Sequence, residues 1–69
     1  MVYQHEQLVA AAQAAGDHTD SDIADRLKVA RVTAWRLRTG KTAPSASTLA
    51  RIELAYGLTA ADLLGGEAA

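Results

Sequence analysis

Three glycines, at positions 16, 40 and 57, interrupt a sequence in which apolar residues otherwise recur every three or four positions. That spacing places apolar side chains on one face of an α-helix. Glycine adopts the left-handed conformation at a helix carboxyl end without steric cost, so each of these glycines marks a helix end. Sixteen alanines and a single proline, Pro44, also favour helices over strands. The chain is therefore predicted to be all-α, built from short helices that each have one face to bury.

The pattern predicts five helices, over about 4–15, 20–28, 31–38, 47–56 and 60–64. Hydroxyl or carboxylate side chains that can cap helix amino ends precede three of them: Thr19 or Asp20, Ser45 or Ser47, and Thr59. The side chains expected to face the core are Leu8, Ala11, Ala12, Ala15, Ile23, Ala24, Leu27, Ala34, Leu37, Leu49, Ile52, Ala55 and Tyr56. Residues 65–69 are expected to form a loose tail.

The 69 residues suffice for one domain, spanning 1–69, and contain no cysteine, which excludes disulfides and thiolate metal sites. The apolar runs are far shorter than the roughly 18 to 20 residues that cross a bilayer. The amino-terminal residues lack the basic start and apolar run of a secretory signal. We therefore expect a cytoplasmic protein with no membrane partner.

The order of the charges indicates a polyanionic partner. All seven basic residues lie between positions 26 and 51 with no acid among them, and all eight acids lie outside that stretch. A surface selected only for solubility would mix the two signs. A positive face that binds a polyanion is therefore expected.

The third predicted helix has an unusual outward surface. At 100° per residue, Ala34 and Leu37 define its inward direction, and Val32 points about 170 to 190° away from it. Trp35 and Arg36 lie roughly 130° to either side of that direction. A valine and a tryptophan are thus expected to face outward between arginines.

Two short helices joined by about three residues, the second rich in outward basic side chains, describe a helix-turn-helix over about 20–38. Residues 19–64 resemble the Cro/C1-type helix-turn-helix family. The residues in register with it are Thr19, Ile23, Ala24, Leu27, Val29, Gly40, Lys41, Pro44, Ser45, Leu49, Ile52, Tyr56, Gly57, Leu58, Leu63 and Leu64. The resemblance implies a compact five-helix domain of the lambda-repressor-like type.

It also implies that the third helix enters the major groove of double-stranded DNA, where each base pair shows a distinct pattern of donors and acceptors. The residues expected to read bases are Arg31, Val32, Thr33 and Arg36. An arginine suits guanine and a valine suits the thymine methyl group. The residues expected to contact the DNA backbone, or backbone and bases together, are Ser21, Trp35, Arg38, Thr39, Lys41 and Thr42.

Three positions depart from the family pattern. Lys28 replaces a usual glycine, which predicts a strained or reshaped turn. Asp20 replaces a glutamine that clamps a phosphate, leaving Ser21 or the helix amides for that contact. Arg38 replaces a glutamate that pairs internally, so it becomes a candidate backbone contact.

For several other side chains, packing within the protein or exposure to solvent is an alternative to DNA contact. Trp35 could instead pack within the monomer or bind a protein partner. Arg26 and Lys28 could attract DNA or be solvated charges, and Arg51 is expected to face solvent. Tyr56 is expected to be a core aromatic with its hydroxyl at the surface.

The function that the resemblance implies is that of a small bacterial or phage repressor occupying an operator. A single module buries only roughly 600 to 1,000 Å², so a homodimer on a two-fold symmetric site is expected, formed in solution or only on DNA. Leu63 and Leu64 are either part of its dimer surface or core. Two alternatives stay open: an antitoxin that regulates its own operon, and a protein-interaction adaptor that does not bind DNA.

No catalytic motif is present. His5 and His18 adjoin Glu6 and Asp17, but no HExxH spacing, nucleophile elbow or glycine-rich phosphate loop accompanies them. A core this small is also expected to leave little room for a pocket of roughly 300 Å³, the size at which small-molecule sites begin. We expect no enzyme activity, metal, cofactor or small-molecule ligand.

Overall fold

The computed structural model describes residues 3–64, so the tail predicted for 65–69 lies outside the described residues. The elements are α1 (His5–Ala14), α2 (Asp20–Leu27), α3 (Arg31–Thr39), α4 (Ala46–Tyr56) and α5 (Ala60–Leu64). No strand occurs in this part of the chain. The prediction of an all-helical chain is confirmed, and the helix bounds differ from those predicted by about a residue.

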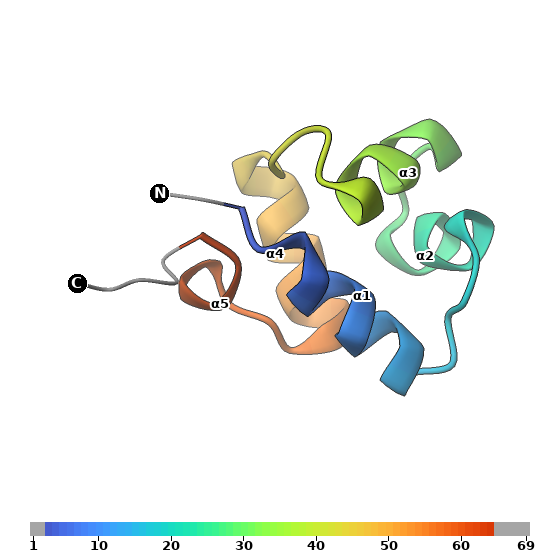
Figure 1. Cartoon of the computed structure of the whole chain (residues 1–69), viewed down its shortest axis with the longest axis horizontal. Helices are drawn as coiled ribbons and strands as arrows, with labels where there is room; N and C mark the ends of the chain where they lie inside the picture. Colours follow the sequence, from blue (N-terminus) through green and yellow to red (C-terminus); the bar gives the residue numbers. More distant parts are fainter. Residues whose placement is uncertain (1–2, 65–69) are drawn as a thin grey trace.

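One small core joins all five helices. In Figure 1, α1 crosses in front of α4, with α2 and α3 toward one end of the molecule and α5 toward the other. The most extensive packing is between α2 and α3, while α1 contacts α3, α4 and α5. The buried apolar side chains are Leu8, Ala12, Ile23, Ala24, Leu27, Ala34, Leu37, Ile52 and Leu63.

The partly buried apolar side chains complete this core. Those packed against it are Tyr3, Val29, Leu49, Ala55, Tyr56, Leu58 and Leu64. The prediction for α1 is wrong at Ala15, which is exposed because the helix ends at Ala14 and the chain turns away at Gly16. Leu63 is fully buried and Leu64 packs on the core, so Leu63 is unavailable to a dimer surface.

Side-chain caps fix where α2, α4 and α5 begin. The Thr19 hydroxyl accepts a hydrogen bond from the Asp22 amide, and the Asp22 carboxylate accepts one from the Thr19 amide, at 3.1 and 3.3 Å. The same reciprocal arrangement joins Thr59 and Asp62. Ser45 caps α4 by accepting from the Thr48 amide. Of the residues predicted as alternatives, Thr19 and Ser45 are therefore the caps.

The amino-terminal segment holds α3 and α5 together. The Gln4 amide donates to the Leu63 carbonyl at 2.7 Å, and the Tyr3 hydroxyl donates to the Leu37 carbonyl at 2.8 Å. Burial raises the pKa of the Tyr3 hydroxyl to about 12, so it remains a donor at neutral pH. His5 packs against Gly40, where φ is 79° and an added Cβ would lie 2.7 Å from the His5 Nδ1 atom. The backbone angle therefore favours glycine at position 40, and a larger residue there would also have to displace the His5 side chain.

The turn between α2 and α3 carries a side chain in the left-handed conformation. Lys28, the residue at which the sequence predicted a strained or reshaped turn, has φ 61° and ψ 44°. Arg51 of α4 braces the turn, because its Nη1 donates to the Leu27 and Lys28 carbonyls at 3.2 and 3.0 Å. Arg51 is exposed, as predicted, but its guanidinium also satisfies carbonyls that the end of α2 leaves without helical partners.

Replacing Lys28 by glycine should stabilise the fold. The left-handed conformation costs a residue with a side chain about 1–2 kcal/mol, a cost that glycine avoids. Glycine also has more conformational freedom in the unfolded chain, which offsets about 0.5–1 kcal/mol of this stabilisation. We expect Lys28→Gly to raise the free energy of unfolding by about 0.5–1 kcal/mol and Tm by roughly 2–8 °C. Lys28→Ala removes the same charge but keeps the strain, so thermal melting should show no comparable gain. Equal Tm values for the two variants would contradict this account.

Candidate nucleic-acid interface

The outward surface of α3 is as the helical spacing predicted. Ala34 and Leu37 are buried against the core, whereas Val32 is 51% exposed and Trp35 is 40% exposed. Arg31 and Arg36 are also exposed, and Thr33 is half-buried. The predicted orientation of α3 is confirmed, and its surface combines two large apolar side chains with two arginines.

The carboxyl end of α3 is ordered by its own hydrogen bonds. The Thr39 hydroxyl donates to the Trp35 carbonyl at 2.8 Å, and the Lys41 amide donates to the Arg36 carbonyl at 2.9 Å. The hydroxyl hydrogen of Thr39, a predicted backbone contact, is therefore engaged within the protein. Thr42 is exposed in the following loop.

Trp35 and Lys41 lie together. The Lys41 Nζ atom is 5.9 Å from the centre of the Trp35 ring, within the range of a cation–π contact. This pair joins α3 to the first residue after its capping glycine. Both residues were expected near the DNA backbone, but no spacing in the sequence predicts that they contact each other.

The amino ends of α2 and α3 meet through another predicted pair. Arg31 Nη1 lies 3.4 Å from the Ser21 hydroxyl oxygen, a long hydrogen bond at the protein surface. Arg31 begins α3 and Ser21 lies in the first turn of α2. Arg31, a candidate base reader, and Ser21, a candidate phosphate contact, therefore lie on one surface.

Arg38 is paired within the molecule. Its Nε and Nη2 atoms donate to the two carboxylate oxygens of Asp20, and this hydrogen bonding raises the pKa of the Arg38 guanidinium. From the sequence we expected Arg38 to be a candidate DNA-backbone contact, and we expected Asp20 to leave the phosphate contact to Ser21 or the helix amides. The ion pair explains both positions: each side chain offsets the charge of the other at the side of α3.

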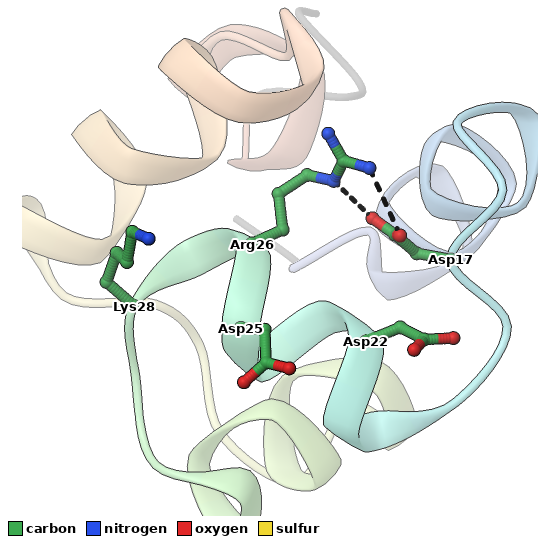
Figure 2. A pocket seen from close by; sticks show the side chains of 5 residues that line it. All are labelled: Asp17, Asp22, Asp25, Arg26 and Lys28. Carbon is green, nitrogen blue, oxygen red and sulfur yellow. Dashed lines mark hydrogen bonds and ion pairs between the residues drawn. The ribbon is translucent and has the colours of Figure 1, made fainter.

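Asp17 forms a second internal network, of which Figure 2 shows the pair with Arg26. Its carboxylate accepts hydrogen bonds from Arg26 on α2 and, at 2.7 Å, from the Tyr56 hydroxyl on α4. The Arg26 guanidinium also lies 5.8 Å from the Tyr56 ring centre. The hydroxyl of Tyr56 is thus bonded to a buried carboxylate, which corrects the expectation that it simply faces water. This network ties the loop after α1 to α2 and α4.

These contacts sort the seven basic residues into two groups. Arg26, Arg38 and Arg51 are held by Asp17, Asp20 and the carbonyls of the α2 end. The other four basic side chains, which have neither an ion pair nor a hydrogen bond to a backbone carbonyl within residues 3–64, are Lys28, Arg31, Arg36 and Lys41. The positive charge free to meet a partner is therefore smaller than the sequence count indicates, and most of it lies on α3 and the loop after it.

Figure 2 shows a hollow lined by charged side chains. It has a volume of about 450 Å³, and a second hollow of about 330 Å³ lies nearby, but both open widely to solvent and neither encloses a pocket. The residues lining the larger one are Asp17, Asp22, Asp25, Arg26 and Lys28. Asp17 and Asp22 are already bound by Arg26, Tyr56 and backbone amides. In residues 3–64 no group of three or more His, Cys, Asp or Glu side chains is arranged to hold a metal ion.

Several structural residues carried no usable signal in the sequence. Tyr3 and His5 reach α3 from more than thirty positions away, and the Asp17–Arg26 pair spans a loop, so neither helical nor strand spacing relates them. Only the general rule that buried polar groups find partners could have indicated a tie for Asp17.

Comparison with protein-family models, with curated protein sequences and with solved structures finds no significant match to this chain. None of the helices in residues 3–64 has the length and apolar character needed to span a membrane.

The Asp17 network should make stability depend on pH in the acid range. Hydrogen bonds from Arg26, and then from Tyr56, hold the pKa of the Asp17 carboxyl below its usual value. Because the folded-state pKa is lowered, its stabilisation is present above the unfolded value of about 3.9 and is lost as the pH falls through the folded value.

Asp17→Asn should therefore melt at a lower temperature than the parent at pH 7, and the difference should shrink as the pH falls below about 4. Thermal melts between pH 7 and pH 2 measure this. Asp25→Asn is the matched control, since Asp25 is exposed and makes no side-chain hydrogen bond within the described residues. A difference between Asp17→Asn and the parent that stays constant down to pH 2 would refute the assignment.

Proposed function

We propose that this protein is a sequence-specific regulator that binds double-stranded DNA by placing α3 in the major groove, in the manner of a small Cro/C1-like repressor. The observation that carries the proposal is the two-sided character of α3. Its Ala34 and Leu37 side anchors the helix in the core, while Arg31, Val32 and Arg36 project outward. A helix fits the major groove, and these side chains are of the types that pair with guanine and contact the thymine methyl group.

The placement of the acids supports the same partner. Asp20 is the acid nearest the amino end of α2, and Arg38 neutralises it. Asp17 is held by Arg26 and Tyr56, away from α3. Ser21, whose hydroxyl lies beside Arg31, is then the side chain in the first turn of α2 that is suited to a phosphate. A polyanion can thus approach α3 without meeting an uncompensated carboxylate from these two positions.

Arg36 should account for part of the base preference. A bidentate contact to guanine supplies about 1–3 kcal/mol of discrimination, so Arg36→Ala should weaken binding to the selected site by roughly 5- to 150-fold. Selection of sites from random duplex DNA, with the parent and the variant side by side, should show that one base position loses its preference. Lys28→Ala, which removes one unpaired charge outside α3, is the control and should leave that preference unchanged. An unaltered selected site for Arg36→Ala would overturn the assignment of α3.

Lys41 should contribute affinity without base preference. Removing a phosphate contact weakens binding to all DNA sequences similarly and lowers the salt dependence of binding by about one unit of slope. Lys41→Ala should therefore bind selected and random duplexes more weakly by the same factor, as measured by titration at several salt concentrations. A loss confined to the selected duplex would make Lys41 a base reader instead.

Two protomers should occupy one selected site. A single small module buries too little surface for tight specific binding, and a two-fold operator doubles the contacts. Sizing of the complex by analytical ultracentrifugation, with and without the selected duplex, measures the stoichiometry. One protomer per duplex, with an asymmetric selected sequence, would remove the homodimer from the proposal, whereas failure of the parent protein to bind any duplex at low ionic strength would remove DNA binding itself.

A further inference from the structure

The contact between Trp35 and Lys41 joins a side chain of the outward α3 surface to one of the loop that follows it. Trp35 is 40% exposed, which is high for so large an apolar ring. Lys41 is exposed and directs its ammonium group toward that ring, 5.9 Å from its centre. The ring is therefore neither a core side chain nor freely solvated over its whole surface.

The backbone around this pair is fixed at both ends. The Trp35 carbonyl accepts from the Thr39 hydroxyl, and the Lys41 amide donates to the Arg36 carbonyl. Gly40 between them is held in the left-handed conformation and against His5. The Cα positions of Trp35 and Lys41 are thus fixed by the end of α3, and the Lys41 side chain is the part that stays flexible.

A lysine side chain has four rotatable bonds, and fixing it in an interface costs roughly 0.5–1.5 kcal/mol in conformational entropy. An aromatic face restricts that freedom before binding because it attracts the ammonium group. Indole is the most effective of the aromatic rings in this respect. Trp35 can therefore reduce the entropy that Lys41 loses when it contacts an anion.

We propose that Trp35 is a positioning residue for Lys41, holding its ammonium group at the edge of α3 where it contacts a DNA phosphate. The proposal rests on the proposed function, since it assigns the lysine a phosphate partner. Trp35 acts through Lys41 and reads no base. This arrangement gives a reason for a large aromatic side chain to lie on the exposed surface of α3, beside Lys41.

A double-mutant cycle tests the proposal. Trp35→Leu keeps an apolar side chain but removes the ring, and it should weaken binding to the selected duplex and to a random duplex alike by about two- to fivefold. Trp35→Phe keeps an aromatic face and should lose less. In a Lys41→Met background, Trp35→Leu should cause no further loss, because the charge that the ring positions is gone.

The contact is also measurable in the free protein. A lysine above an aromatic face is shielded by the ring current, so the ε-methylene protons of Lys41 should resonate upfield of those of Lys28, the other lysine of the chain. Trp35→Leu should abolish that shift. Thermal melting of each variant separates a loss of folding from a loss of positioning, since Trp35→Phe and Trp35→Leu should both melt cooperatively near the parent.

Three results would overturn the proposal. Equal losses for Trp35→Leu in the parent and Lys41→Met backgrounds would mean that the ring contacts DNA directly. A changed base preference in site selection with Trp35→Leu would make the ring a base reader. Unchanged affinity for Trp35→Leu would leave the ring without a role in binding. The parent protein's own binding at low ionic strength tests DNA recognition separately, so failure of the cycle in a protein that binds DNA rejects only the role of Trp35.

Discussion

The packing of α3 on the core depends on Ala34 and Leu37, the two side chains of this helix that are buried. A small alanine lets the helix approach closely, and the leucine supplies the apolar volume that α1 and α2 pack against. The exposed side chains of α3 are consequently not needed to pack the helix on the core. That division allows Val32 and Arg36 to vary chemically without altering how the helix is held, whereas Arg31 also bonds Ser21 of α2.

The charge pattern has two different uses in the folded chain. Arg26 and Arg38 pair with acids that lie before them in the sequence, and Arg51 satisfies carbonyls at the end of α2. These three arginines hold helices to one another. The remaining basic residues, on α3 and in its flanking turns, are the ones that long-range attraction to an anion can use. A cluster of one sign in a sequence therefore overstates the charge of a surface whenever part of it is neutralised by distant residues.

Helical spacing, glycines and capping residues were enough to predict the five helices and the orientation of α3, because each of these signals is local. Lys28 was correctly singled out, since its position required an unusual backbone angle. The roles of Tyr3, Arg51 and Tyr56 could not be predicted, because each depends on a contact between segments far apart in the chain. The pairing of Trp35 with Lys41 was missed for a different reason: helix periodicity says nothing about where the first loop residue directs its side chain.

The bond between the Gln4 amide and the Leu63 carbonyl has a consequence for how the protein is made. Gln4 finds this partner only once residue 63 has also been synthesised, and α1 contacts α5 as well. The packing of α1 can therefore be completed only after α5 has left the ribosome. Until then the apolar surface of α1 that α5 covers stays exposed, and such transiently exposed surface is prone to aggregation.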